Sequence, residues 1–189
     1  MRVEVFIKNM VCDRCVKVLR NELKEEGLNL DIVELGRIVY ETSNPVNDHR
    51  KMEKVLVANG FSVVLKPDTI LVEQVKICLI DLMNNLPIKK TGPLSAYLTE
   101  ITGHTYTRLS RTFSINENIT IEKYFIKLKT EKVKELIQSN QLNFTQISHL
   151  LDYSNINHLS RQFKAETGMN LSEYRGMKKN FRNSLDQIL

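Results

Sequence analysis

The sequence has only three cysteines and no long hydrophobic run, and each absence excludes a class of protein. A membrane-spanning helix needs about 18 to 20 consecutive apolar residues, and no segment approaches that length. Residues 1–7 alternate apolar and polar side chains, unlike the hydrophobic region of a signal peptide. Three cysteines also make a poor disulfide framework. We therefore predict a cytoplasmic protein that does not bind membranes.

Motifs of catalysis are missing as well. The chain contains no Gly-rich phosphate loop, no His-x-x-x-His pair and no Gly-x-Ser-x-Gly elbow. His49, His104 and His149 are isolated, and we interpret them as solvated or capping residues. A chain of 189 residues can form one average domain or two small ones, but not a large multi-domain enzyme. The sequence therefore predicts a protein that is not an enzyme.

The charge is unevenly distributed along the chain. Apolar residues make up 42% and charged residues 26%, which is typical of a folded globular protein. Residues 1–70 hold 11 basic and 11 acidic residues, whereas residues 71–189 hold 16 basic and 11 acidic residues and carry the whole net charge of +5. A basic half beside a neutral half favours a polyanion-binding module attached to a module with another task.

The hydrophobic periodicity of the first 65 residues predicts an alternation of strands and helices. Gly27 and Gly60 end the two helical patterns, and Gly36 fits a tight hairpin between two strands. The expected strands are 2–7, 30–34, 37–41 and 61–65, and the expected helices are 12–26 and 48–59. This βαββαβ order is the split βαβ pattern of a ferredoxin-like sandwich.

From residue 69 onward the periodicity is helical throughout. Asp68 or Thr69 is the expected N-cap of a helix that runs to about residue 84. The further expected helices are 95–102, 106–114, 120–139, 145–151 and 155–167, followed by a helical tail to Leu189. The predicted fold class is α+β, with a ferredoxin-like domain at 1–67 and an all-α domain at 68–189.

The helical part contains an internal repeat at an offset of 50 residues. The segment LSRTF, which begins at Leu109, recurs as LSRQF, which begins at Leu159. The alignment extends back without gaps, so that residues 98–101 overlie residues 148–151. Each copy reads as two short helices around a tight turn. The sequence therefore predicts two helix-turn-helix units joined by the long helix 120–139.

Residues 71–178 resemble the DNA-binding domain of AraC-type transcription regulators. The resemblance rests on the duplicated unit and on residues 157–175, which read NHLSRQFKAETGMNLSEYR. It implies two helix-turn-helix units joined by one long helix, and double-stranded promoter DNA as the partner. One departure is Asp152, where the family usually has glycine in the turn of the second unit. Asp tolerates the left-handed conformation better than most residues, so we expect the turn to persist.

The recognition helix of such a unit lies in the major groove with its N-terminal residues toward the base edges. Arg suits guanine and Asn suits adenine, while hydroxyl groups and helix N-termini suit phosphates. The predicted base contacts are Thr105, Tyr106, Thr107 and Arg108 in the first unit, and Asn155, Asn157 and His158 in the second. Ser110 and Ser160 are the predicted phosphate contacts, and Leu109, Phe113, Leu159 and Phe163 belong to the core by their period.

Two interpretations stay open for this half. Arg111 and Arg161 occupy the same place in the repeat, and a repeated arginine either binds phosphate or braces its own unit by a salt bridge. The alternative to DNA binding is a helical protein-binding domain whose basic face is merely solvated. A chain with two reading units can bind DNA as a monomer or as a homodimer.

The segment from Asn9 to Cys15 is a second motif of interest. It reads NMVCDRC and follows the first strand at the start of the first helix. The N-terminal domain resembles a heavy-metal-associated domain, in which the motif is Gly-Met-x-Cys-x-x-Cys, and Gly60-Phe61 resembles that family's Gly-aromatic pair before the last strand. Asn9 stands where the family has glycine. The resemblance implies a two-thiolate Cu(I) site at Cys12 and Cys15.

Chemistry also favours a metal at this position. Two cysteines separated by two residues converge on one ion, and the helix N-terminus stabilises their thiolates. Soft thiolates select Cu(I) or Zn(II), although a closed zinc site needs further ligands, and no His lies close in sequence. The alternatives are a thiol-disulfide redox sensor, an inherited remnant without function, and a metal-trafficking or sequestering protein with a protein-binding helical half.

The remaining sulfur-containing residues are interpreted as packing residues. Met10 is expected to pack beneath the cysteine loop. Cys78 shares a helical stripe with Leu71, Val75 and Leu82 and is assigned to the core. We expect the state of the Cys12–Cys15 pair to change how the sensor packs on the first helix-turn-helix unit, through the helix 69–84.

Overall fold

The computed structural model describes residues 1–90 and 92–177. The part of the predicted helical tail beyond residue 177 lies outside these residues. Within them, no helix is long and apolar enough to cross a membrane.

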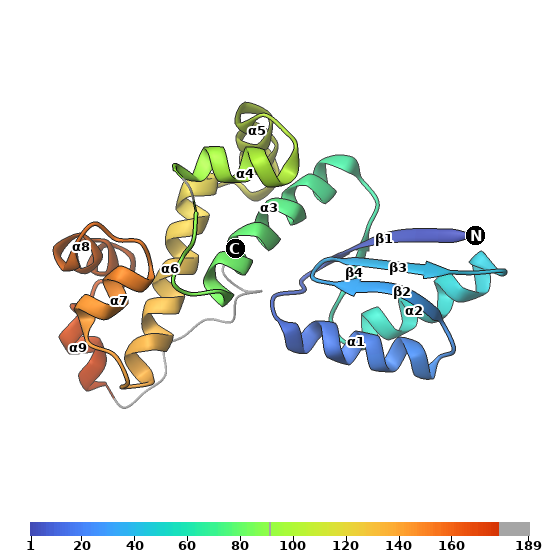
Figure 1. Cartoon of the computed structure of the whole chain (residues 1–189), viewed down its shortest axis with the longest axis horizontal. Coiled ribbons are helices and arrows are strands. Elements are labelled where there is room, and N and C mark those ends of the chain that lie inside the picture. Colours follow the sequence, from blue (N-terminus) through green and yellow to red (C-terminus); the bar gives the residue numbers. More distant parts are fainter. Residues whose placement is uncertain (91, 178–189) are drawn as a thin grey trace.

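The N-terminal half has the predicted βαββαβ order of elements. Its strands are β1 (Arg2–Lys8), β2 (Asn29–Glu34), β3 (Arg37–Glu41) and β4 (Ser62–Val64). They form one antiparallel sheet in the order β2-β3-β1-β4, so β1 and β3 are the central strands. Helices α1 (Asp13–Glu25) and α2 (Pro45–Ala58) cover one face of this sheet, as Figure 1 shows.

The alternation of β1 explains this arrangement. Val5 and Ile7 point to the helical face and are buried with Leu19 and Leu23 of α1. The interleaved Glu4 lies on the opposite face of the sheet, where it pairs with Arg37. One face of the sheet therefore forms a core with α1 and α2, and the other is polar along part of its length.

Helix α2 begins one turn earlier than predicted. Pro45 is a residue type common in turns, but here it occupies the first helical position, where its missing N–H costs nothing. The backbone N–H of Asn47 donates to the side chain of Asn44 at 3.3 Å, so Asn44 is the N-cap.

Helices make up the rest of the described chain, in seven segments over residues 66–90 and 92–177. They are α3 (Pro67–Asn84), α4 (Leu94–Thr102), α5 (Tyr106–Glu117), α6 (Ile121–Gln138), α7 (Phe144–Leu150), α8 (Ile156–Thr167) and α9 (Leu171–Gly176). The predicted N-cap of α3 is wrong, because the helix starts at Pro67, with Lys66 as N-cap and no side-chain cap bond. Pro67 sets the start in the same way as Pro45 does.

The predicted repeat is present as two helix pairs, α4–α5 and α7–α8, joined by α6 (Figure 1). Phe113 and Phe163 are both buried, as predicted. The repeat extends further than the sequence analysis recognised. Phe113 packs on Tyr124, and Phe163 packs on Tyr174, with ring centroids 5.5 Å apart in each pair. The short helix α9 therefore repeats the first turns of α6.

The two halves have separate cores and meet along α3. Gly36, in the β2–β3 hairpin, lies so close to α3 that a Cβ atom on it would be 2.0 Å from Cδ1 of Ile77. Val11, in the loop after β1, packs against the core of the helical half. Figure 1 shows α3 placed between the sheet and the other helices, so α3 is the element along which the two halves are in contact.

Candidate nucleic-acid interface and thiol pair

Helix α5 presents the predicted contact residues of the first unit. Thr105, Thr107 and Arg108 are exposed, and Thr105 is the N-cap residue of α5 without a side-chain cap bond. The guanidinium of Arg108 lies 3.4 Å from Nδ1 of His104, which is one turn earlier. Leu109 is buried in the core of the helical half, whereas the three exposed residues point toward solvent. The structure therefore leaves these three side chains accessible to a ligand.

Tyr106 is placed differently from its neighbours. It is half-buried, and its hydroxyl donates a hydrogen bond to the carboxylate of Glu122 at the start of α6. Burial, together with this hydrogen bond, raises the pKa of Tyr106 well above its usual range. The hydroxyl thus ties α5 to α6.

Helix α8 presents the residues of the second unit. Asn155 is its N-cap, and its side-chain oxygen accepts from the backbone N–H of His158 at 2.9 Å. Asn157 and His158 are exposed. The ring of His158 packs edge-on against Tyr153 at 5.4 Å, and its Nδ1 lies 3.3 Å from the hydroxyl of Ser154. Asn155 therefore shapes the helix start, while Asn157 and His158 project from it.

The repeated serines and arginines occupy matching positions on α5 and α8. Ser110 and Ser160 are half-buried, whereas Arg111 and Arg161 are exposed. Neither arginine has a hydrogen bond or ion pair with another residue in the ranges 1–90 and 92–177. A salt bridge that would brace the unit is therefore not formed by either arginine with these residues.

Other residues perform that bracing, and sequence analysis missed them. Nζ of Lys76 on α3 lies 2.8 Å from Glu117 at the end of α5 and 3.3 Å from Glu73, and all three are largely buried. Nζ of Lys123 on α6 lies 2.6 Å from Glu166 near the end of α8. These partners are 41 and 43 positions apart in the sequence, so no local pattern indicates them.

The turn of the second unit adopts the expected conformation. Asp152 has a φ of 55°, in the left-handed region, as predicted from its tolerance for that conformation. Its carboxylate pairs with Lys90 at 2.7 Å, and the N–H of Ile88 donates to the carbonyl of Leu150 at 2.9 Å. The segment after α3 therefore docks onto the second unit.

Lys129 on α6 is buried against the same turn. Its Nζ lies 4.3 Å from the ring centroid of Tyr153 and 5.1 Å from that of Phe125. Burial lowers the pKa of Lys129 to about 8, because desolvation disfavours the ammonium form. The two rings offset part of that cost through cation–π contact.

Cys12 and Cys15 lie together at the start of α1. Cys12 is the N-cap residue, both side chains are half-buried, and the two Sγ atoms are 3.5 Å apart. Asn9 has a φ of 75° and donates from Nδ2 to the carbonyl of Gly60 at 3.3 Å. Asn tolerates this left-handed conformation, so it can stand in the loop where the resembling family has glycine.

Partial burial raises the pKa of the Cys15 thiol, and this desolvation outweighs the backbone hydrogen bonding at the helix start. No group of three or more His, Cys, Asp or Glu side chains suited to a metal occurs in residues 1–90 and 92–177. Within that part of the chain, an ion at the pair would have two protein ligands.

The loop that carries the pair touches both halves of the molecule. Met10 is buried in the N-terminal core, as predicted, and its sulfur accepts from the backbone N–H of Gly36 at 3.4 Å. Val11 packs on the other core. On α3, Leu71 is buried as the predicted apolar stripe requires, whereas Cys78 is half-buried.

Residues 98–177 match the family model described as a helix-turn-helix domain. This match runs from the middle of α4 through α9, so both helix pairs lie within a helix-turn-helix domain, as predicted. It begins well after the Cys12–Cys15 pair. No curated protein matches the chain.

Two solved structures are similar to this chain. The C-terminal domain of AraT, a response regulator from Geobacillus stearothermophilus, is 20% identical over 63% of this chain and 93% of that chain, with a TM-score of 0.50. A DNA-binding transcriptional dual regulator from Escherichia coli K-12 is 16% identical over 60% of this chain and 95% of that chain, with a TM-score of 0.47. The likeness to the first structure shows a shared fold.

Proposed function

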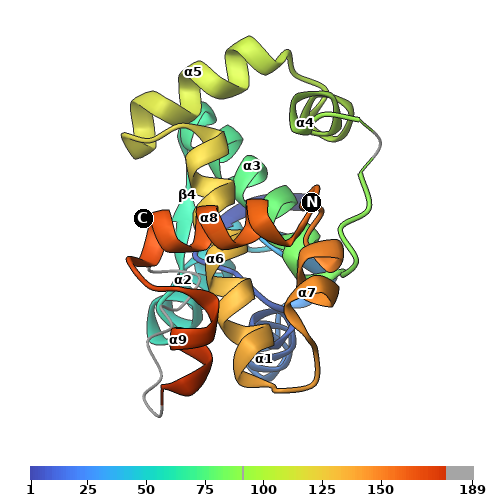
Figure 2. The same ribbon diagram turned by 90° about the vertical axis from the view of Figure 1, so that its left-hand side faces the viewer.

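We propose that the protein is a sequence-specific DNA-binding transcription regulator, and that a soft metal ion at Cys12 and Cys15 modulates it. The observation that carries DNA binding is the duplication of one exposed helix. Figure 2 shows α5 beyond the upper end of α6 and α8 crossing in front of α6, with the two helices running in similar directions. Arg111 and Arg161 sit at the same position of the two helices, exposed and without a described partner. Paired cationic helices of this kind suit successive stretches of a duplex.

The predicted contacts divide into three roles by their surroundings. Tyr106 and Asn155 are engaged in holding their helices, through Glu122 and the α8 cap respectively. The exposed side chains nearest the helix starts are base readers, namely Thr105, Thr107, Arg108, Asn157 and His158. Phosphate contacts fall to Ser110, Ser160, Arg111 and Arg161, because these lie further along the helices.

Selection from a randomised duplex library tests the DNA-binding half. The metal-free, reduced protein is expected to enrich one motif, and Arg111→Ala or Arg161→Ala is expected to weaken binding to all duplexes. The matched control is Arg50→Ala, which removes the same charge from an exposed position on α2. An absence of enrichment would instead favour the trafficking protein with a protein-binding helical half.

The metal-binding half rests on the N-terminal domain and its thiols. We infer a ferredoxin-like, heavy-metal-associated-like domain from the element order, the strand order β2-β3-β1-β4 and the position of the pair at the start of α1. The two half-buried sulfurs, 3.5 Å apart, suit a shared soft ion. With metal–sulfur bonds of about 2.3 Å, a linear ion needs sulfurs about 4.6 Å apart, so one thiol would rotate away. A tetrahedral Zn(II) ion would need two outside ligands.

The loop supplies the coupling. Cys12 directly follows Val11, which packs on the helical core. Met10, one residue before Val11, accepts a hydrogen bond from the hairpin residue Gly36. We expect a ligand-driven rotation of the Cys12 side chain to shift Met10 and Val11. Such a shift would change how the N-terminal half packs against α3. A second candidate signal is oxidation, because thiols whose sulfurs lie 3.5 Å apart need little movement to form a disulfide.

Duplex affinity measured with Cu(I), with Zn(II), without metal and after oxidation tests the coupling. We expect one metal to change Kd by about 5-fold to 150-fold, the usual range of allosteric coupling. Cys12→Ser should abolish the change, and Cys78→Ala, which removes the third cysteine, should keep it. A change on oxidation alone would select the redox sensor, and an identical Kd in all four states would contradict any signalling role for the pair.

A further inference from the structure

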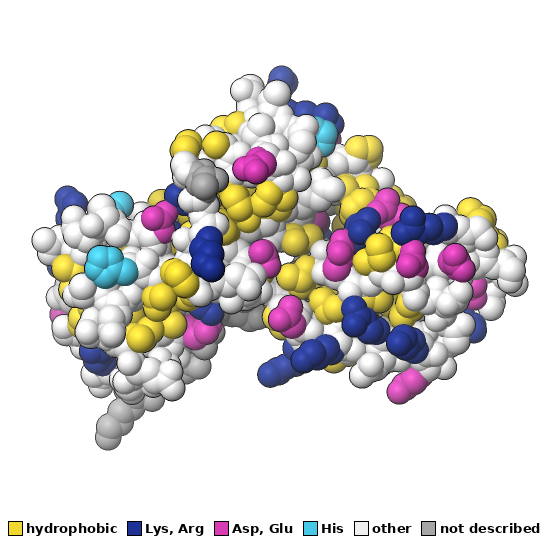
Figure 3. Space-filling model, viewed as in Figure 1, with side chains coloured by type: hydrophobic (Ala, Val, Ile, Leu, Met, Phe, Trp, Pro, Cys, Tyr) yellow, Lys and Arg dark blue, Asp and Glu magenta, His cyan; other side chains and the backbone are white. Residues whose placement is uncertain are grey.

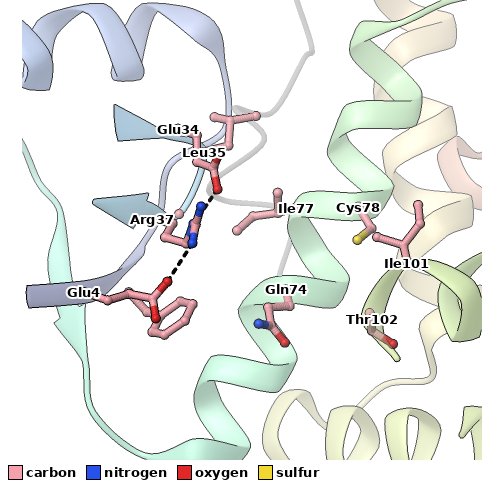
Figure 4. Close-up of a pocket in the computed structure, with 11 residues that line it drawn as sticks. Glu4, Glu34, Leu35, Arg37, Gln74, Ile77, Cys78, Ile101 and Thr102 are labelled. Atoms are coloured by element: carbon pink, nitrogen blue, oxygen red, sulfur yellow. Dashed lines mark hydrogen bonds and ion pairs between the residues drawn. The ribbon is translucent and has the colours of Figure 1, made fainter. Parts of the chain in front are cut away.

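A pocket of about 340 Å³ lies where the N-terminal sheet meets α3 and the end of α4. Figure 3 shows hydrophobic side chains around the hollow between the two halves, and Figure 4 shows the lining. Because the residues come from both halves, the pocket is complete only when the halves are packed together. Its volume lies within the range of about 300 to 1,000 Å³ typical of small-molecule sites.

Two of its sides are apolar. Phe6 and Leu35 line it from the sheet and hairpin, and Ile77 and Ile101 line it from α3 and α4. Ile101 is 53% exposed, in the last turns of α4. A hydrocarbon group in the pocket would remove this apolar surface from water, which favours binding.

The sheet side also carries an unbalanced charge. Nη1 of Arg37 lies 2.7 Å from Glu4, and its Nε lies 2.5 Å from Glu34. Two carboxylates therefore share one guanidinium, and the lining has a net charge of −1 because it includes no other charged residue. The side chains of Glu4 and Glu34 are 47% and 54% exposed, so they retain oxygen lone pairs for a ligand.

The helical side adds neutral polar groups. Gln74 faces Glu4 and Arg37 across the pocket in Figure 4, and its carboxamide has no hydrogen-bond partner within residues 1–90 and 92–177. Burial raises the pKa of Cys78 to about 11, so its thiol is neutral near pH 7. The helices thus contribute hydrogen-bonding capacity without further charge.

We propose that this pocket binds a small organic ammonium ion, with its hydrocarbon body between Phe6 and Ile101 and its ammonium group toward Glu4 and Glu34. An anion would be repelled by the net negative lining, and an uncharged hydrocarbon would leave the carboxylates unused. Ile101 and Thr102 end α4 directly before the turn to α5. A bound ligand would therefore also affect the position of the first recognition helix. This effect on DNA binding rests on the proposed function, whereas the ligand site itself does not.

Titration calorimetry of the full chain with three matched probes tests the site. The probes are 2-phenylethylammonium, neutral 2-phenylethanol and anionic 3-phenylpropionate. We expect saturable binding of the ammonium probe at about one tenth of the Kd of the alcohol or less, and no binding of the carboxylate. Equal affinity for the ammonium and the alcohol, or no saturable binding of the ammonium, would overturn the proposal.

Two variants locate the binding. Glu34→Gln keeps the side-chain shape but removes the charge, and Ile101→Ala removes apolar surface at the mouth of the pocket. Each substitution should lower the affinity for the ammonium probe by about tenfold. Ile115→Ala, at a 66% exposed position on α5 outside the pocket, should leave its affinity unchanged. Unchanged binding in both pocket variants would refute the assignment. The measurement contains neither DNA nor metal. Its outcome therefore does not depend on whether the proposed regulator function is correct.

Discussion

Arg108 and Arg111 lie on the same helix, yet their surroundings predict different effects on DNA. Arg108 is exposed in the first turn of α5, where side chains face base edges. Arg108→Ala should therefore cost about 1–3 kcal/mol on the preferred duplex and relax the preference at one base pair. Fluorescence anisotropy with the preferred duplex and its single-base variants measures this. An equal loss on every duplex would make Arg108 a phosphate contact instead.

Lys129 makes stability depend on pH. Its pKa is about 8 in the folded protein against an ordinary value of 10.5, so the unfolded state binds more protons between these values. Stability should therefore rise with pH across this window, and the full cost of burying the ammonium should be present below about pH 8.

Lys129→Met tests this assignment, because it fills the same space without charge. The variant should be more stable than the parent at pH 7, by up to about 3 kcal/mol, and its advantage should shrink at pH 9.5. Urea unfolding at the two pH values gives both numbers. An advantage of the same size at both would show that Lys129 does not titrate in this window.

At the scale of elements, two recognition helices end in matched left-handed caps. Asn118 after α5 has a φ of 57°, and Gly168 after α8 has a φ of 76°. A Cβ on Gly168 would meet nothing within 4 Å, so Gly168→Ala should cost about 1 kcal/mol from conformation alone. Gly176→Ala, at a glycine without positive φ and with equal open space, should cost nothing. Thermal unfolding compares them, and equal effects would contradict the cap assignment.

The elements themselves were largely predictable from periodicity. The buried stripe of α6 follows from apolar spacing, and Phe125, Leu128 and Val133 are buried as that spacing requires. Helix starts were harder, because Pro45 and Pro67 resemble turn residues in sequence but occupy the first helical position in the structure. The aromatic pairs could have been found by extending the same 50-residue offset to Tyr124 and Tyr174.

For the candidate sites, the sequence predicted which side chains are exposed but not which of them are held by other residues. Period and motif placed Arg108 and Arg161 on open helix faces. Which side chains have hydrogen-bond or ion-pair partners depends on packing between distant segments. Examples are Tyr106 with Glu122 and Lys76 with Glu117. The pocket between the halves had no sequence signal, because its lining comes from five separate helices and strands.

At the scale of the whole molecule, the Gly36–Ile77 contact should decide how firmly the halves dock. Gly36→Ala introduces a Cβ at a φ of 70° and 2.0 Å from Cδ1 of Ile77. We expect a loss of about 1–2 kcal/mol in stability and faster hydrogen exchange in α3. Gly60→Ala is the matched control, since its φ is 77° but a Cβ there would meet nothing within 4 Å. Identical α3 exchange in both variants would mean that this contact does not hold the halves together.

The salt dependence of binding to a selected duplex tests whether α5 and α8 together bind DNA. If α5 and α8 both contact phosphates, log Kd plotted against log salt should have a slope of several units, since each contact contributes about 0.9. Arg111→Ala and Arg161→Ala should each reduce that slope by about one unit, whereas Arg50→Ala should not. A slope near zero, or one insensitive to both arginines, would contradict DNA binding through the two matched helices.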